Sequence, residues 1–163
     1  KMKSLRSLFL GAACALTAGM AAQAAETPEA CRALPGVDAL LERPSLDYVI
    51  LGEAHGTTEL PAVFGDLVCA AAQRGPVTVG LEFLPREQAS LDAYLASDGG
   101  AEARAALLAS EGWADPYGRA SEAIFQLVEQ LRVLKAGGAL LTVAAFDHPS
   151  ETPGTSATSS GSA

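Results

Sequence analysis

A short apolar run that leads directly into a polar turn is the feature that most restricts how this chain can fold. Residues 48–51 read Tyr-Val-Ile-Leu, which is typical of a buried β-strand, and residues 52–56 read Gly-Glu-Ala-His-Gly. In open parallel sheets, ligands bind outside the carboxyl ends of the strands, where loops present polar groups. The turn therefore predicts a site containing Glu53 and His55. The alternative is a helix-capping Glu53 and a solvated His55.

Two further apolar runs also end in ionisable residues. Residues 77–81 precede Glu82, and residues 140–146 precede Asp147 and His148. If the three runs are parallel strands, all five ionisable residues gather along one edge of the sheet, including both histidines of the chain. We therefore expect Asp147 and His148 to contribute to ligand binding.

The segments between these runs have the periodicity of helices, with apolar residues three and four apart. Helices are expected over residues 58–73, from Pro85 to about residue 95, over residues 101–110 and over residues 120–135. This order predicts an α/β fold in which βαβ units build a parallel sheet of three strands with flanking helices.

The chain changes character after His148. Residues 149–163 contain no large apolar side chain, so they are expected to form a disordered Ser/Thr/Gly tail. Three strands would leave an open edge, which suggests that residues 25–148 are part of a larger α/β fold. The alternative is a complete minimal domain with a flexible tail.

The first residues resemble a secretory signal peptide. Lys3 and Arg6 precede an Ala-rich apolar stretch that ends in a small-x-small motif, and cleavage is expected after Ala24. The protein is then exported to a periplasm or secreted, without a stable membrane span; a lipid anchor on Cys14 is a less favoured alternative.

The charge of the exported chain narrows the choice of partners. Without residues 1–24 it has eight Lys and Arg residues against nineteen Asp and Glu residues, a formal charge of −11. That charge repels nucleic acid and anionic lipid, and favours a small-molecule ligand or substrate. An oxidising compartment permits a disulfide between Cys31 and Cys69; alternatively, both are small buried hydrophobic residues.

The predicted site supports two kinds of chemistry. His55 could act as a general base whose tautomer is fixed by Glu53 or Glu82. The same three residues could instead bind Mn²⁺, Fe²⁺, Co²⁺ or Zn²⁺. The chain has no serine nucleophile elbow, no phosphate-binding glycine loop and no zinc-finger spacing, so those classes are disfavoured.

The motif Leu-Gly-Glu-Ala-His-Gly-Thr at residues 51–57, followed by Gly-Leu-Glu at residues 80–82, resembles the superfamily of erythromycin esterases, ChaN-type haem-binding lipoproteins and Tiki/TraB proteases. The similarity covers about residues 46–148 and is greatest to the ChaN-like bacterial branch, which also resembles this chain at Arg119-Ala120-Ser121 and Phe146-Asp147. It implies an α/β fold in which Glu53, His55 and Glu82 form the first half of the site. A second Gly-x-x-His turn, which the family has, is missing from this sequence.

This resemblance leaves three interpretations open. The first is an exported hydrolase that uses Glu53, His55 and Glu82 with or without a metal. The second is a haem- or iron-binding protein in which His55 or His148 ligates iron. The third is an inactive, truncated member of the superfamily.

Overall fold

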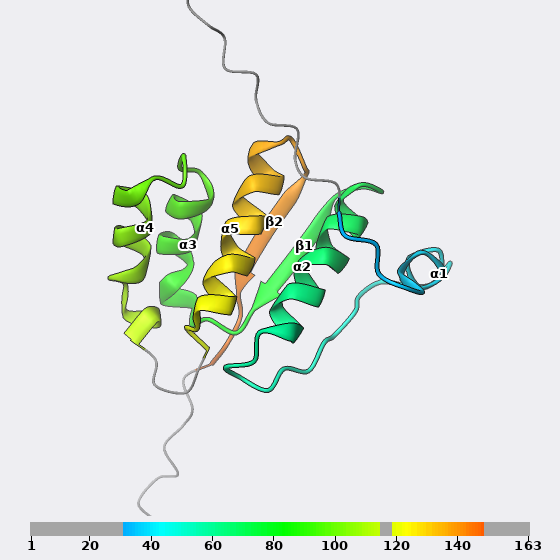
Figure 1. Ribbon diagram of the computed structural model, residues 1–163, viewed down its shortest axis with the longest axis horizontal. Helices are drawn as coiled ribbons and strands as arrows, with labels where there is room; N and C mark the ends of the chain where they lie inside the picture. Colours follow the sequence, from blue (N-terminus) through cyan, green and yellow to red (C-terminus); the bar gives the residue numbers. More distant parts are fainter. Residues whose placement is uncertain (1–30, 115–118, 149–163) are drawn as a thin grey trace, which may run out of the picture.

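The computed structural model describes residues 31–114 and 119–148, whose arrangement is shown in Figure 1. The expected signal peptide, the alternative lipid anchor at Cys14 and the expected tail lie outside these residues. In chain order the elements are α1 (Val37–Leu41), α2 (Glu59–Ala72), β1 (Val77–Leu81), the 3₁₀ turn η1 (Pro85–Glu87), α3 (Gln88–Leu95), α4 (Ala101–Leu108), the 3₁₀ turn η2 (Glu111–Ala114), α5 (Glu122–Ala136) and β2 (Leu141–Ala145).

The strands β1 and β2 are parallel neighbours, with Val77 opposite Leu141 and Leu81 opposite Ala145. Helices α3, α4 and α5 form the connection between them. The predicted α/β character is therefore confirmed. Within the described ranges, no helix is both long enough and apolar enough to cross a membrane.

Helices α2 and α5 cover one face of this sheet (Figure 1). Helix α5 begins where the Ser121 hydroxyl accepts a hydrogen bond from the Ile124 backbone N–H, and its apolar stripe packs on the strands. Alternate strand residues point into this core, while Thr78 and Thr142 are exposed on the opposite face. The side chains that are most completely buried are Leu91, Leu107, Leu131, Val79 and Val128.

The prediction of a third strand over residues 48–51 is wrong. Among the described residues the sheet has two strands, and residues 48–51 belong to no helix or strand. Tyr48 and Ile50 are 76% and 83% exposed. Because helices cover only one face of the sheet, pairing this segment with β1 would leave both side chains in water and gain little apolar burial.

The outer edge of β2 is closed by a side chain of α3. The Gln88 amide donates to the Val143 carbonyl at 2.9 Å and accepts from the Ala145 N–H at 2.8 Å. It thus occupies the hydrogen-bonding positions of a neighbouring strand. This contact satisfies backbone groups that an open edge would leave unpaired.

The segment that precedes α2 is attached to that helix by a covalent bond and by ion pairs. Cys31 and Cys69 form a disulfide with their Cα atoms 5.6 Å apart, which is the pairing that the sequence left open. Arg32 contacts Asp66 at 2.7 Å. These links hold residues 31–55 beside α2.

Candidate functional site

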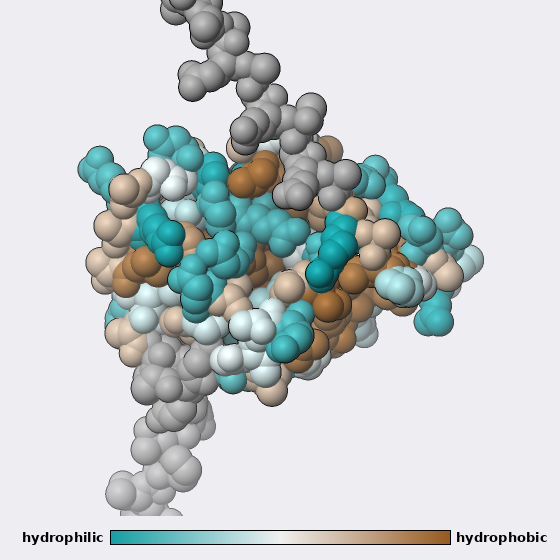
Figure 2. Space-filling view, viewed as in Figure 1, coloured by the Kyte–Doolittle hydropathy of each residue, from teal (hydrophilic) through white to brown (hydrophobic). Residues whose placement is uncertain are grey.

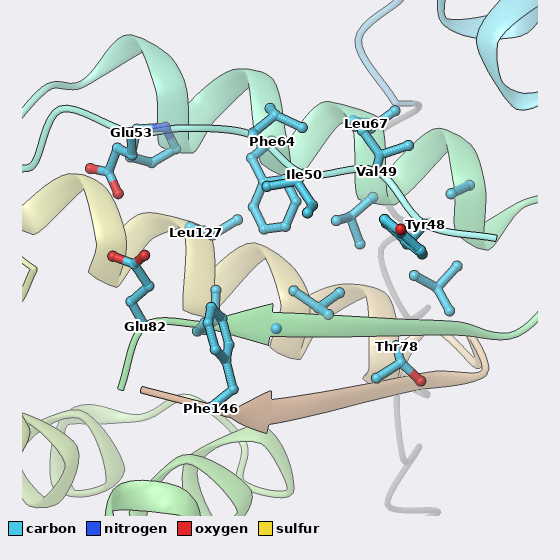
Figure 3. Close-up of a pocket in the computed structure, with 18 of the residues that line it drawn as sticks. Tyr48, Val49, Ile50, Glu53, Phe64, Leu67, Thr78, Glu82, Leu127 and Phe146 are labelled. Atoms are coloured by element: carbon cyan, nitrogen blue, oxygen red, sulfur yellow. The ribbon is translucent and has the colours of Figure 1, made fainter. Parts of the chain in front are cut away.

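A cavity of about 670 Å³ lies between residues 46–53, helix α2 and strand β1. We call residues 46–53 the wall segment. Figure 3 shows that it runs beside β1 in the same direction, from Tyr48 to Glu53. In the space-filling view, hydrophobic side chains gather beside α2 on the side that faces α1 (Figure 2).

The wall segment keeps the alternation of a strand although it is not paired with β1. Val49, Leu51 and Glu53 are partly buried, whereas Tyr48 and Ile50 are largely exposed, although all five border the cavity. An alternation of period two is the mark of extended backbone. The segment therefore directs Glu53 towards the same space as its apolar side chains.

A tight turn after the wall segment positions His55. The Thr57 N–H donates to the Ala54 carbonyl at 3.2 Å, and Gly56 has φ of 86°. A positive φ at this position of a turn favours glycine, because a Cβ atom would be strained there. The glycine that follows the histidine in the sequence thus allows the chain to reverse and present the imidazole.

The structure brings Glu53, His55 and Glu82 together. The Nδ1 atom of His55 lies 3.5 Å from Oε2 of Glu53, and its Nε2 atom lies 3.2 Å from Oε2 of Glu82. The side chains of Glu53, His55 and Glu82 are 21%, 30% and 55% exposed, respectively. The imidazole is therefore held between a largely buried carboxylate and one that is open to solvent.

This arrangement constrains the protons of the site. A neutral imidazole donates from one ring nitrogen and accepts at the other, whereas an imidazolium donates from both. Neutral His55 can satisfy only one of the two glutamates, and gaining a proton at the second nitrogen satisfies the other. Such a group is suited to accept and return a proton.

Two oxygen atoms near His55 lack partners. Among the described residues, Oε1 of Glu53 and Oγ1 of Thr57 are buried without a hydrogen bond. Buried polar atoms are normally satisfied by protein, water or a ligand. The site thus has acceptor capacity for a bound water or substrate donor.

A cation also lines the cavity. Arg119, from the connection before α5, forms an ion pair with Asp147. The Asp147 N–H donates to the Phe83 carbonyl at 2.9 Å, and Phe83 directly follows Glu82. The Arg119–Asp147 pair therefore lies just past the ends of both strands. The sequence assigns Arg119 no role beyond the resemblance at residues 119–121, although it is a cation just before the capped start of a helix.

The other predicted ligand residues differ in position. Asp147 reaches the edge of the cavity only through Arg119, and does not itself line it. His148 is exposed and also lies outside the lining, so of the two histidines it is His55 that lines this cavity. The residue directly after Asp147 turns away from the sheet edge into solvent.

The geometry does not support Glu53, His55 and Glu82 as one metal centre. The two glutamates face opposite nitrogens of the ring, and one ion cannot bind at both nitrogens of a single imidazole. In the described part of the chain, no three His, Cys, Asp or Glu side chains are placed to hold a metal ion. Haem iron would likewise require one ring nitrogen to turn away from its carboxylate.

Comparison of this chain with known protein families, with curated protein sequences and with solved structures found no match.

Proposed function

We propose that this chain is an exported hydrolase that cleaves esters, with His55 as its general base. The observation that carries the proposal is His55 held between two carboxylates at the mouth of an apolar cavity. The resemblance of residues 51–57 and 80–82 to erythromycin esterases is consistent with this chemistry. The Cys31–Cys69 disulfide is consistent with export, because disulfides persist in oxidising compartments.

In this mechanism Glu53 accepts a hydrogen bond from Nδ1–H of His55 and fixes the tautomer. Nε2 then takes a proton from a water molecule, and the resulting hydroxide attacks the ester carbonyl carbon. The exposed Glu82 stabilises the imidazolium that forms and has room to move when water enters. The tetrahedral intermediate then collapses with cleavage of the ester C–O bond, and the imidazolium gives its proton to the departing alkoxide, so the products are a carboxylic acid and an alcohol.

The negative charge that develops on the carbonyl oxygen needs a positive partner. Arg119 lines the same cavity, and its pairing with Asp147 restricts its side chain. A cation that is positioned before the reaction stabilises a developing oxyanion without reorganisation. We assign Arg119 this role in the proposed reaction.

The two histidines of the chain provide a matched test. Hydrolysis of p-nitrophenyl butyrate by the wild-type protein would be compared with His55→Ala and with His148→Ala, which alters an exposed residue outside the cavity. We expect His55→Ala to lower kcat/KM by about 100-fold or more, the usual contribution of a general base. His148→Ala should retain wild-type activity.

Equal activity in all three proteins would refute the proposal and indicate a contaminating esterase. Haemin titration of the same samples tests the other interpretation. A Soret band that depends on His55, without ester hydrolysis, would assign the site to haem binding instead.

A further inference from the structure

The cavity is elongated along β1. Its lining includes every residue of that strand from Val77 to Leu81, and four residue steps of about 3.3 Å give a length of roughly 13 Å. Glu53 and Glu82 lie at one end, and Tyr48 and Thr78 lie towards the other (Figure 3). The cavity is thus a slot with a reacting end and a far end.

Most of the side chains that line the slot are apolar, while Asp47, Arg74 and Thr78 also belong to its lining. Helix α2 runs back from the reacting end, so Phe64 lies beside Ile50 and Leu67 lies beside Val49 (Figure 3), and Ala71 is one helical turn further towards the far end. The apolar lining side chains come from the wall segment, α2, β1 and α5: Leu46, Val49, Leu51, Leu60, Phe64, Leu67, Val68, Ala71, Val77, Val79, Leu81, Ile124 and Leu127. A ligand that fills the slot is therefore expected to be apolar where these side chains line it.

We propose that the slot binds the linear acyl chain of a neutral ester, with the ester carbonyl at His55. Carbon–carbon bonds of about 1.5 Å advance a staggered chain by roughly 1.3 Å per carbon, so a 13 Å slot holds about ten carbons. This assignment rests on the proposed ester hydrolysis, and it adds the substrate class.

Charge at the reacting end selects the ester over the free acid. Glu53 and Glu82 both line that end, and together with Asp147 they outnumber Arg119, so the net charge there is negative although Arg119 can still contact the carbonyl oxygen. A fatty-acid carboxylate placed beside two glutamates is repelled, whereas a neutral ester is not. The same repulsion favours release of the acid product after hydrolysis.

The substrate class can be tested with p-nitrophenyl esters of two to sixteen carbons. We expect kcat/KM to rise at least tenfold from the acetate to the decanoate and then to fall for longer chains. Ala71→Phe fills the far end and should remove the advantage of the eight- and ten-carbon esters over the acetate. The matched control is Ala62→Phe, an exposed position on the same helix outside the lining.

Binding is measured separately from turnover. In the inactive His55→Ala protein, a neutral ketone with a ten-carbon chain should displace the fluorescent probe N-phenyl-1-naphthylamine, and Ala71→Phe should abolish that displacement. Displacement without hydrolysis in the wild type would support the slot while refuting the proposed esterase. Hydrolysis that is independent of chain length, with no displacement, would overturn the acyl assignment and leave the esterase in place.

Discussion

The disulfide between Cys31 and Cys69 should contribute more to the stability of this site than any other single link. The 38-residue separation of the two cysteines spans the wall segment, Glu53 and His55. We predict that the double variant Cys31→Ala/Cys69→Ala loses about 4 kcal/mol of unfolding free energy at 25 °C. Alanine is chosen because Cys69 is buried, and a serine hydroxyl would need a partner there.

The magnitude follows from the entropy of the unfolded chain. Closing a loop of this length removes about 13 cal/mol/K from the unfolded state, which corresponds to about 4 kcal/mol. The neighbouring ion pair contributes little in comparison, because the side chain of Arg32 is 66% exposed, and exposed pairs are worth roughly 0–1 kcal/mol. The wall segment has no pairing with β1 that could replace the disulfide.

Urea denaturation of the oxidised wild type, the reduced wild type and the double variant measures this effect. Reduction should lower the midpoint of the wild type towards that of the double variant, and adding reductant to the double variant should change nothing. A difference below about 0.5 kcal/mol between oxidised wild type and double variant would refute the loop-entropy argument. If the double variant kept the wild-type urea midpoint but no longer bound N-phenyl-1-naphthylamine, the wall segment would detach without unfolding of the rest of the protein.

Four other predictions follow from local geometry and charge. Gly56→Ala should cost about 1 kcal/mol, because its φ is 86°, and should lower ester hydrolysis by displacing the neighbouring histidine. Gln88→Ala should cost about 1–3 kcal/mol in urea denaturation by leaving two backbone groups of β2 unpaired. The hydrogen bonds from Arg132 lower the pKa of Glu129, so this pair stabilises the fold above the usual glutamate pKa. Its contribution is lost as the pH falls through the lowered pKa. In Glu129→Gln, the free energy of unfolding should therefore change less with pH across that range. Burial raises the pKa of Tyr94 to about 12, so the stabilisation that comes from protonated Tyr94 is complete below pH 10 and is lost as the pH rises towards 12. Thermal melts of the wild type and of Tyr94→Phe at alkaline pH would check this loss.

The helices could be predicted from the sequence because their signals are local. Helix α5 has an apolar stripe, a capping Ser121 and a glycine at its end, and the structure places it at Glu122–Ala136. The wall segment also has a local signal, the apolar run of residues 48–51, but strand pairing depends on what covers both faces of the sheet. Such cover is a property of the whole fold and cannot be read from residues 48–51 alone.

The contact among Glu53, His55 and Glu82 could be predicted for a similar reason. Each residue directly follows an extended segment, and two parallel extended segments bring their carboxyl ends to one place. Arg119 comes instead from a connection without periodicity, so its entry into the cavity depends on how α5 packs. His148 shows the limit of the rule, because a single further residue is enough for the chain to turn outward.

The unpaired wall segment links the cavity to the dependence on the disulfide. If residues 48–51 hydrogen-bonded to β1, the backbones would lie about 4.8 Å apart and no slot would remain between them. The slot therefore exists only because that pairing is absent. For the same reason, no backbone hydrogen bonds to β1 hold the wall segment in place. Its position depends on apolar contacts with α2 and on the covalent link at Cys69. A ligand fills the slot only when the wall is in place, so an acyl chain should bind the oxidised protein more tightly than the reduced protein and raise its unfolding free energy by more.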